Sequence, residues 1–450
     1  MLRKKSPFLS KPYSAYHHRD VPEDDKELTR VGPGTPAGDY LRRFWHPVAY
    51  TRLVKDRPLA LKIMGEELVL FRDKSGRIGL VEAHCPHRGT SLEYGKIEQL
   101  GIRCCYHSWL IDVDGRILET PGESEDSTLK EKLYHGAYPI KEFRGLIFAY
   151  MGPPDKIPAF PAFDIFEAPG RSWEAGVSEG RGAPTHVPCN WLQDVDNFVD
   201  IQHEEFLHAT ISEVQFLEPS GRPLEELALI GQTEYLETPI GILTLAARRV
   251  RPETVWVRNI EFVWPNIAIL GRSTILMDHQ WGPKETEVHS LPRIVWAVPI
   301  DDNNHMMLDM AHMPIGGAYT STSRGGAIYP SPSRPKSYDE MQRIPGDYEA
   351  QISQRPIAVH ALEHLGTTDR GVIMMRKGLR RRIRIVQQGQ DPPELEAFQG
   401  RTVSTHGGDT LLRVPQASTP QEDEKRLKQL ARELGTRYLQ TPPNAIAQGG

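Results

Sequence analysis

Cysteine is scarce in this chain of 450 residues, which contains only four. Cys85, Cys104 and Cys105 lie within one stretch of 21 residues, and Cys189 is far from them. This distribution gives poor coverage for a disulfide framework. Clustered cysteines in a reducing compartment indicate metal or redox chemistry instead.

Long apolar runs are also absent. The longest, such as Leu146–Met151, are far shorter than the roughly 20 residues that a membrane-spanning helix requires. The basic start Met1–Lys5 is not followed by the apolar core of a secretory signal. A formal net charge of −5 provides no global basic field for nucleic acid or an acidic membrane surface. We therefore expect a soluble, cytoplasmic protein that binds neither.

Glycine and proline, by contrast, are plentiful, with 38 and 37 residues, and 39% of the chain is hydrophobic. A chain of this length and composition is expected to form two or three turn-rich folding units. Short β-prone runs alternate with turn signals over residues 61–83, 110–118 and 145–151, after which Gly152-Pro153-Pro154 ends the pattern. The sequence thus predicts a small antiparallel β domain that ends near residue 155.

The rest of the chain carries mixed helix and strand signals. Residues 190–210 and 347–384 have helical spacing, and Thr367 or Thr368 is the expected N-cap of the last helical stretch. These signals predict an α+β fold. The β-prone runs between the helices are residues 242–250, 255–263, 294–300 and 306–310. The expected organisation is an N-terminal extension (1–40), the small β domain (41–155), a larger domain (156–390) and a partly helical, partly disordered C-terminal extension (391–450).

Two pairs of metal-ligating residues lie in the small β domain. Cys85-Pro86-His87 is followed, after sixteen residues, by Cys104-Cys105-Tyr106-His107. A zinc site more often takes like ligands from each loop, whereas a Rieske [2Fe–2S] centre needs two thiolates on one iron and two imidazoles on the other. The pattern predicts a cluster on Cys85, His87, Cys104 and His107, with a structural zinc knuckle as the alternative. Cys105 and Cys189 are expected to be non-ligands.

A second candidate site lies in the predicted helix at residues 190–210, where Asp200, His203 and His208 form a D-x₂-H-x₄-H run. Two imidazoles and one carboxylate on one face of Fe(II) leave positions open for O₂. Residues five apart are separated by about 140° around an ideal α-helix, so both histidines reach one metal only if the helix bends or ends between them. An acidic helix face with two hydrogen-bonded histidines would give a similar run.

These motifs together resemble those of one protein family. His84–Gly89 and Cys104–Trp109 are similar to the cluster loops of Rieske non-haem iron oxygenases, the terminal (alpha) components of ring-hydroxylating systems. The run from Asn190 to His208 is similar to their iron motif. The resemblance implies a Rieske domain followed by a helix-grip-like catalytic domain with a central antiparallel sheet flanked by helices. Further segments, which resemble the phthalate dioxygenase branch and extend the likeness over about residues 31–385, are Gly346–Gln351, Arg355–Ile357, Glu363–Ile373 and Val298–Asp302.

The resemblance also assigns roles to single residues. The carboxylate ligand of the mononuclear iron maps to Asp347, with Asp369 as the fallback. In this family the aspartate before the first histidine is not a ligand but hydrogen-bonds a cluster histidine of the neighbouring subunit. Asp200 is therefore expected to bridge to His87 or His107 across a trimer interface, and Asn197 of the same motif is counted with it as catalytic.

The implied activity is reductive O₂ activation on a small aromatic substrate. Because the sequence has no G-x-G-x-x-G dinucleotide motif, a separate NAD(P)H-dependent reductase, with or without a ferredoxin, is expected to supply electrons. The expected reaction is hydroxylation of an aromatic carboxylate by a homotrimer or hexamer. The alternative is O- or N-demethylation of a methoxylated aromatic acid or similar compound. A pure electron-transfer Rieske protein would leave the second motif without a purpose.

Two groups of basic residues have open interpretations. Arg248, Arg249 and Arg251 lie near a predicted strand, where they either pair with a substrate carboxylate or form solvated charges on a strand edge. The stretch Arg376–Arg384 has six basic residues in nine. In a net acidic chain, this stretch favours a solvated helix face or a docking surface for the reductase over nucleic-acid binding.

Overall fold

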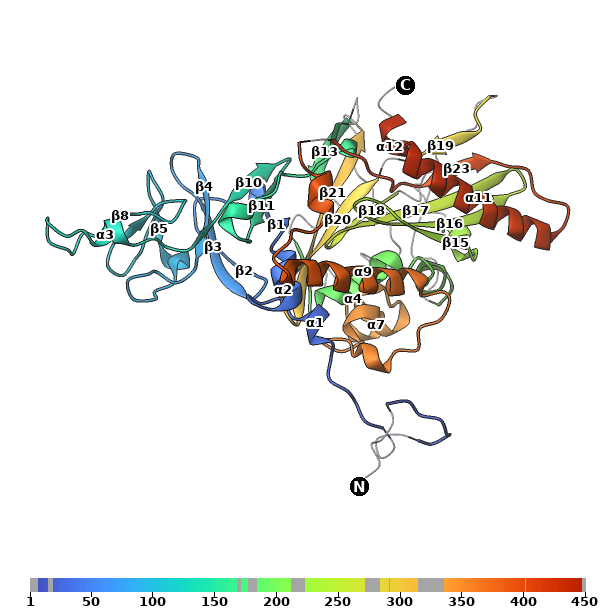
Figure 1. The fold of residues 1–450 in the computed structure, drawn as a ribbon, viewed down its shortest axis with the longest axis horizontal. Coiled ribbons are helices and arrows are strands. Elements are labelled where there is room, and N and C mark those ends of the chain that lie inside the picture. The colour runs from blue at the N-terminus through green and yellow to red at the C-terminus, as the bar shows by residue number, and fades with distance from the viewer. Residues whose placement is uncertain are drawn as a thin grey trace.

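The computed structural model describes residues 7–14, 19–167, 171–176, 184–211, 223–271, 284–290, 292–314, 336–400 and 402–446. A small β-rich unit projects from one end of a larger body of sheet and helices (Figure 1). This arrangement confirms the predicted α+β fold, with a small antiparallel β domain ahead of a larger sheet-and-helix domain. Within the described ranges no helix is long and apolar enough to cross a membrane.

The small unit consists of short antiparallel strands joined by tight turns, as the turn signals predict. Its inner part is a four-stranded sheet in the order β2-β3-β4-β9, with a three-stranded sheet β1-β11-β10 beside it. Its outer part is a second four-stranded sheet, β5-β6-β7-β8. The strands are β1 (Trp45–Tyr50), β2 (Leu59–Ile63), β3 (Glu66–Arg72), β4 (Ile78–Glu82), β5 (Lys96–Ile97), β6 (Ile102–Arg103), β7 (Leu110–Ile111), β8 (Ile117–Glu119), β9 (Ala137–Tyr138), β10 (Ile140–Phe143) and β11 (Leu146–Tyr150). The short helix α3 (Leu129–Lys132) follows β8.

The larger unit is built on one antiparallel sheet, with the described strands in the order β13-β21-β20-β18-β17-β16-β15. All four predicted strand runs lie in it, and β14 and β19 join it at its margins. The strands are β13 (Arg171–Ala175), β14 (Thr185–Val187), β15 (Gln232–Glu237), β16 (Gly241–Arg251), β17 (Thr254–Val263), β18 (Ile267–Leu270), β19 (Glu287–His289), β20 (Arg293–Asp301) and β21 (Asn304–Pro314).

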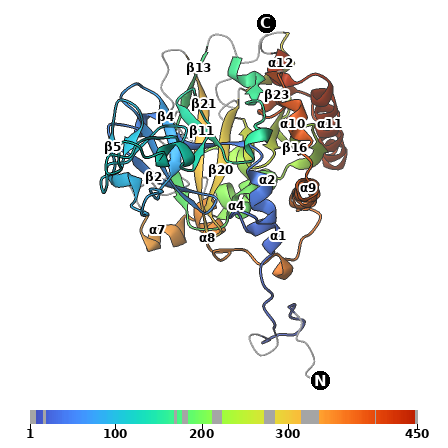
Figure 2. The same cartoon turned by 60° about the vertical axis from the view of Figure 1, so that its left-hand side comes forward.

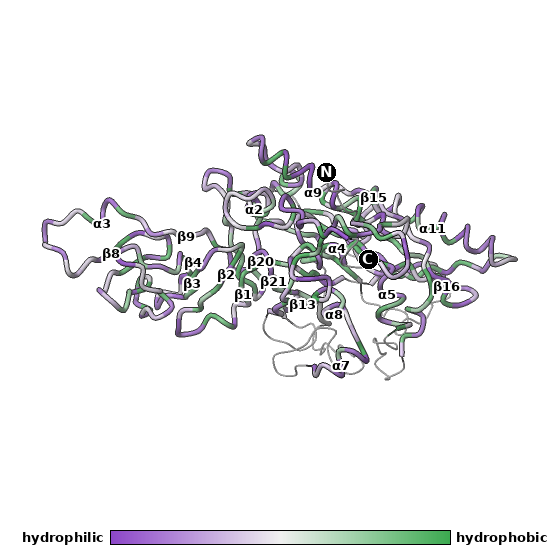
Figure 3. The backbone as a smooth tube through the Cα atoms, turned by 90° about the horizontal axis from the view of Figure 1, so that it is seen from below, coloured by the Kyte–Doolittle hydropathy of each residue, from purple (hydrophilic) through white to green (hydrophobic). Residues whose placement is uncertain are grey.

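Strand alternation gives β16 two differently covered faces. Leu243 and Leu245 pack in an apolar cluster with α11 (Pro420–Gln440). On the opposite face Ala246 packs with Ile201, and Arg248 faces the helical segment that carries the two histidines of the second motif. Figure 2 shows α9 (Arg370–Gln387) and α11 on the side of the body away from the small β unit. The tube in Figure 3 is largely green along the central strands, whereas α11 alternates purple and green.

Within the predicted C-terminal extension (391–450), the described residues 391–400 and 402–446 are part of the larger unit, which corrects our prediction. β23 (Thr410–Arg413) pairs with β17 of the main sheet, and β22 (Thr402–Val403) pairs with β12 (Ala162–Phe163). In α11, Leu427, Ala431, Leu434 and Tyr438 are spaced on one helix face and cover the apolar residues of β16. This apolar stripe explains why α11 packs on the sheet. The short helices α10 (Glu394–Ala397) and α12 (Pro443–Ile446) flank these elements.

The segment predicted as an N-terminal extension is also partly integrated. α1 (Lys26–Thr29) and α2 (Pro36–Leu41) pack against α9, and Leu28 and Tyr40 are fully buried. α9 itself begins after Asp369, so the cap position falls there and not on Thr367 or Thr368. The Gly366 amide donates to the Asp369 carboxylate at 2.6 Å, which closes the turn before the helix.

Asp164, in the 3₁₀ turn η5 (Asp164–Glu167), ties the domain junction to the C-terminal segment. Burial raises its pKa to about 6, although hydrogen bonds from Thr405 act in the opposite direction. Because the folded state holds this proton more tightly than the unfolded chain, stability is lost as the pH rises from about 4 to about 6. We expect Asp164→Asn to remove this pH-dependent loss. Between pH 4 and pH 7, the unfolding free energy of the native chain is expected to fall by on the order of 3 kcal/mol relative to that of the variant.

Urea unfolding at both pH values measures this difference. The control is Asp155→Asn, which makes the same chemical change at an exposed position. Parallel pH profiles for the native chain and Asp164→Asn would contradict the prediction.

Candidate metal centres

The predicted helix at residues 190–210 is not continuous. α4 (Trp191–Val199) ends at Asp200, α5 (His203–Phe206) begins three residues later, and its last turn passes into the π-helical segment η7 (Leu207–Ile211). A π-helical turn bonds residue i to i+5, so residues five apart come to the same side. Both histidines can reach one metal only if the helix bends or ends between them, and the change from α to π geometry meets this requirement.

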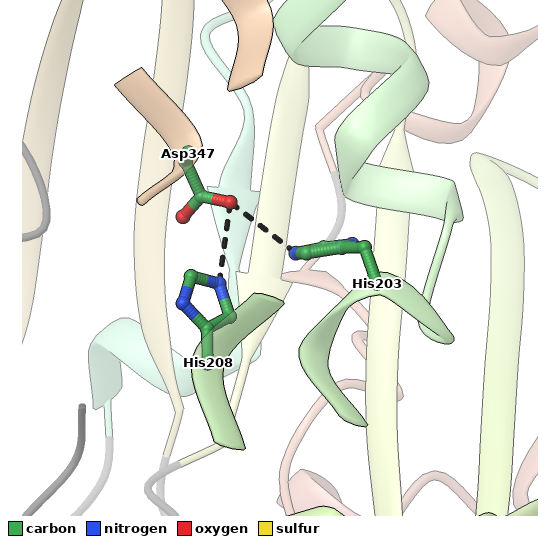
Figure 4. Close-up of side chains that lie close together, drawn as sticks. All are labelled: His203, His208 and Asp347. Atoms are coloured by element: carbon green, nitrogen blue, oxygen red, sulfur yellow. Dashed lines mark ion pairs between the residues drawn. The ribbon is translucent and has the colours of Figure 1, made fainter. Parts of the chain in front are cut away.

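His203, His208 and Asp347 converge on one point (Figure 4). Asp347 is the first residue of α8 (Asp347–Ile352), which is preceded by α7 (Tyr338–Arg343). Its Oδ1 lies 3.3 Å from His203 Nε2 and 3.2 Å from His208 Nε2. Among the described residues, these three form a group that could hold a metal ion, because their ligand atoms all lie within 4.8 Å of one another. Asp369, the fallback ligand, is at the start of α9 and outside this group.

The surroundings of Asp347 keep its carboxylate charged. Burial alone would raise its pKa, but the charge of His208 and hydrogen bonds to both imidazoles hold it well below the usual range. Burial likewise lowers the pKa of His203, while the hydrogen bond and charge of Asp347 outweigh this effect and raise it to about 9. Asn197 Nδ2 donates to Asp347 Oδ1 at 3.1 Å and lies 3.2 Å from His203 Nε2. Two imidazoles and an ionised carboxylate fit a non-haem Fe(II) site.

Two loops of equivalent geometry carry the candidate cluster ligands. The Gly89 amide donates to the Cys85 carbonyl at 2.8 Å, and the Ser108 amide donates to the Cys104 carbonyl at 3.1 Å. Gly89 and Ser108 both have positive φ, at 75° and 59°, so each loop turns back four residues after its cysteine. The two loops therefore make the same backbone turn after their cysteines.

The donor atoms of these loops fit a [2Fe–2S] cluster. Cys85 and Cys104 are buried free thiols, and burial raises the pKa of Cys85 to about 11, with Cys104 adding to the effect. The rings of His87 and His107 lie 4.4 Å apart, and His87 stacks on Trp109 at 4.8 Å. His87 Nδ1 is buried without a hydrogen-bond partner among the described residues, a costly state for a polar atom unless a metal binds it. The other two cysteines differ, since Cys105 is exposed and Cys189 is buried in the larger unit.

Asp200 lies at the C-cap of α4, beside the mononuclear site. Its backbone carbonyl contacts His203 Nδ1, which orients the ring so that Nε2 faces Asp347. With His203 and Asn197 it lines a cavity of about 520 Å³. Burial raises the pKa of its carboxyl group. Figures 1 and 3 place β5 and β8, in the outer sheet of the small unit, at one end of the molecule, and α4 in the larger body.

Two buried ion pairs, which the sequence motifs did not reveal, attach α5 to the sheet. Arg258 of β17 donates to Glu204 at 2.7 Å and to Asp409 at 3.1 Å, and Arg248 of β16 donates to Glu205 at 2.9 Å. The signal in the sequence was two glutamates directly after His203 and an arginine within each apolar strand. These pairs set the height and rotation of α5 over the sheet.

Two of the three strand arginines, Arg248 and Arg249, therefore have a different role from both of our interpretations, whereas the exposure of Arg251 fits a solvated charge. Arg248 is fully buried and neutralised by Glu205, so it is neither a solvated charge nor free to pair with a substrate carboxylate. Arg249 is paired with Asp423 of α11 at 2.7 Å. Arg251 is exposed at the end of β16.

Arg258→Met is expected to lower the unfolding free energy by about 3–5 kcal/mol, because it leaves two buried carboxylates, Glu204 and Asp409, without their cation. The matched control Arg437→Met breaks an exposed pair with Glu287 and is expected to cost less than about 1 kcal/mol. Urea unfolding measures both changes. Equal losses in the two variants would show that Arg258 is not an anchor.

Comparison with known proteins agrees with this geometry. A family described as Rieske [2Fe-2S] domain matches residues 44–143. The chain is 35% identical over 94% of its length, and 90% of the relative's, to a tert-butanol monooxygenase / tert-amyl alcohol desaturase oxygenase subunit from Aquincola tertiaricarbonis. It is 37% identical to the phenoxybenzoate dioxygenase subunit alpha of Ectopseudomonas oleovorans, over 84% of this chain and 89% of that one. The solved structure of a Pseudomonas putida CBB5 NdmA mutant with theobromine has the same fold, with a TM-score of 0.58 at 18% identity over 82% of this chain and 99% of that one.

Fold and sites together define an oxidoreductase with a Rieske domain that incorporates oxygen from O₂. The chain belongs to the Rieske non-haem iron oxygenases, as an oxygenase (alpha) subunit.

Proposed function

We propose that Cys85, His87, Cys104 and His107 hold the [2Fe–2S] cluster and that His203, His208 and Asp347 hold a mononuclear Fe(II). The observation that supports the Fe(II) site is the convergence of two imidazole nitrogens and a carboxylate oxygen within 4.8 Å. When bound, the metals supply electron storage at the cluster and reduction of O₂ at the mononuclear site.

The chain's own residues orient this chemistry. The Asp200 carbonyl fixes the His203 ring, and Asn197 fixes the Asp347 carboxylate. The Arg258 and Arg248 ion pairs hold the supporting helix on the sheet. These contacts orient the ligand atoms, which limits the reorganisation that metal binding and reduction require.

The proposed assembly is a homotrimer, or a hexamer of two trimers. In this assembly, electrons cross from the cluster of one subunit to the mononuclear iron of the next. The small unit, which contains both candidate cluster loops, projects from the larger body that contains α4 (Figures 1 and 3), and this separation supports the arrangement. Asp200 lines the cavity beside the mononuclear site and is placed to accept a hydrogen bond from a cluster imidazole of the neighbour. A separate NAD(P)H-dependent reductase supplies the electrons.

The proposed reaction is hydroxylation of an aromatic substrate, an aromatic carboxylate in the first instance. The phenoxybenzoate dioxygenase relative supports this substrate class. The tert-butanol monooxygenase relative supports the alternative, oxidation of a saturated carbon, which on a methoxy or N-methyl group results in demethylation. Since Arg248 and Arg249 are neutralised by carboxylates, neither supplies the cation for a substrate carboxylate.

Product analysis under ¹⁸O₂ with a surrogate reductase separates these reactions. Aromatic acids and their methoxy analogues are supplied in parallel. Two labelled oxygens in a ring diol support dioxygenation, whereas formaldehyde release with one labelled oxygen supports demethylation. Absence of O₂-dependent product from holoprotein with both classes would contradict the proposed substrate class.

A further inference from the structure

The short helix that carries Asp347 is attached to the protein by polar contacts. Within α8, all of whose residues are described, the buried side chains are Asp347 at the first position and Gln351 four residues later. Residues four apart share a helix face, and both side chains contact α4. Because neither buried side chain is apolar, the place of Asp347 relative to the two histidine ligands (Figure 4) depends on the hydrogen bonds of this face.

Gln351 is bound to two consecutive residues of α4. Its Nε2 donates to Asp194 Oδ1 at 2.8 Å, and its backbone carbonyl accepts from Gln193 Nε2 at 2.8 Å. Its Oε1 is buried without a hydrogen-bond partner in the described part of the chain, so Asp194 is what orients the amide. One turn further along α4, Asn197 donates to Asp347. A row of hydrogen bonds thus joins the two helices and ends at the candidate iron ligand.

A histidine of the main sheet, His305 of β21, anchors Asp194 in turn. Its Nε2 lies 2.9 Å from Asp194 Oδ2, and its Nδ1 lies 2.9 Å from the carbonyl oxygen of Cys189. Both ring nitrogens face oxygen acceptors, so a ring with a proton on each nitrogen satisfies both contacts. The side chains of His305 and Asp194 have no exposed surface (0%). An imidazolium here supplies the counter-charge that a buried carboxylate requires.

We propose that Gln351, Asp194 and His305 are positioning residues of the mononuclear iron site. The contacts run from the sheet to the ligand: His305 of β21 fixes Asp194 of α4, and Asp194 fixes Gln351 of α8. The first turn of the same helix then presents Asp347 to the two histidine ligands. The three residues act through Asp347 and are not ligands themselves. This inference rests on the proposed function, because it assigns them a role toward iron at that site.

Gln351→Met keeps the length of the side chain and removes its donor to Asp194. The variant is expected to raise the Kd for mononuclear Fe(II) by about 10–100-fold, the usual cost of losing an outer hydrogen-bond partner at a metal site. The Rieske absorption of the same sample is expected to stay native. Gln342→Met makes the same change at an exposed position of the preceding helix, α7, and is the control, expected to leave the Kd unchanged.

An exchange of the two partner groups separates positioning from a general loss of structure. Gln351→Glu alone sets a second carboxylate against Asp194 in a buried site and is expected to weaken Fe(II) binding by more than about 100-fold. Asp194→Asn/Gln351→Glu moves the carboxylate to α8 and the amide to α4. The new amide can donate to the new carboxylate while its oxygen accepts from His305, so this variant is expected to recover at least about 10-fold of the loss.

His305→Leu/Asp194→Leu removes both charges together and tests whether iron binding simply follows stability. Replacement of a buried ion pair by apolar side chains often leaves stability unchanged. The urea midpoint is therefore expected to stay near the native value, while Fe(II) binding weakens by about 10–100-fold because Gln351 has lost its acceptor. The control is His186→Leu, at an exposed position of the adjoining strand β14, and it is expected to change neither readout.

The measurement is a competition between the reduced, anaerobic holoprotein and graded concentrations of the ferrous chelator ferrozine. The Rieske absorption reports the cluster, and urea unfolding of the same samples reports stability. Native iron affinity in Gln351→Met, or an exchanged variant that binds iron no better than Gln351→Glu, overturns the inference. Iron losses that follow the urea midpoint in every variant also overturn it. A native chain that has an intact Rieske spectrum but no mononuclear iron would contradict the proposed iron site itself, and this inference with it.

Discussion

Asp347→Ala is expected to remove the mononuclear iron and abolish oxygenation while the Rieske cluster remains. Its Oδ1 is the atom on which both histidines converge, at 3.3 and 3.2 Å, and without it two imidazoles remain as protein ligands. The iron content should fall from about three to about two per chain. Substrate oxidation should fall by more than about 100-fold, since loss of even an outer hydrogen-bond partner of a metal ligand costs 10–100-fold.

The matched control is Asp369→Ala, which removes the other candidate carboxylate. Asp369 accepts a hydrogen bond from Gly366 at the start of α9, so its loss is expected to leave the iron content at about three. Metal analysis and the Rieske absorption spectrum of both variants give the comparison. Iron loss in Asp369→Ala with retention in Asp347→Ala would exchange the roles of the two residues.

Asp200→Asn is expected to retain both metals and yet slow electron transfer between them by about 100-fold, at the upper end of losses for outer-sphere partners. The amide preserves the shape of the side chain and the backbone carbonyl that orients His203. It removes the carboxylate charge that is proposed to hold a cluster imidazole of the neighbouring subunit. Stopped-flow reoxidation of the prereduced cluster by O₂ and substrate measures this step, while reduction by the reductase should remain at its native rate.

Mixed oligomers test whether the transfer crosses between subunits. Asp347→Ala and Asp200→Asn are each defective at the same end of the electron path, so mixing them with each other is expected to restore nothing. Asp347→Ala mixed with Cys85→Ala combines an intact cluster in one chain with an intact mononuclear site in the other. Activity above that of either parent is expected from this mixture, and its absence after verified subunit exchange would place the transfer within one chain.

The local parts of both sites were predictable because their spacing is written in short segments. The cluster residues lie in two loops, Cys85–Gly89 and Cys104–Ser108, whose matching turns follow from the sequence around each cysteine. The demand for a break between His203 and His208 followed from helix geometry alone, and the π-helical segment η7 satisfies it. Asp347 lies about 140 residues further on, so only the family resemblance led to it.

Features that depend on tertiary partners were missed or misread. The apolar spacing of Leu427, Ala431 and Leu434 on α11 was visible, but the β16 face that it covers was not. Arg248 and Arg258 look solvent-exposed in sequence because arginine is rarely buried, and their burial is decided by Glu205 and Glu204 on a distant helix. A charge pattern does not show that two such segments will meet across a sheet.

One chain is proposed to hold both a Rieske cluster and a mononuclear iron on the residues named above. An iron count combined with the electron paramagnetic resonance spectrum of anaerobically purified, reduced protein tests it most directly. We expect a Rieske-type signal and about three irons per chain, two in the cluster and one at His203, His208 and Asp347. Zinc in place of iron, or a silent spectrum after anaerobic reconstitution, would contradict it.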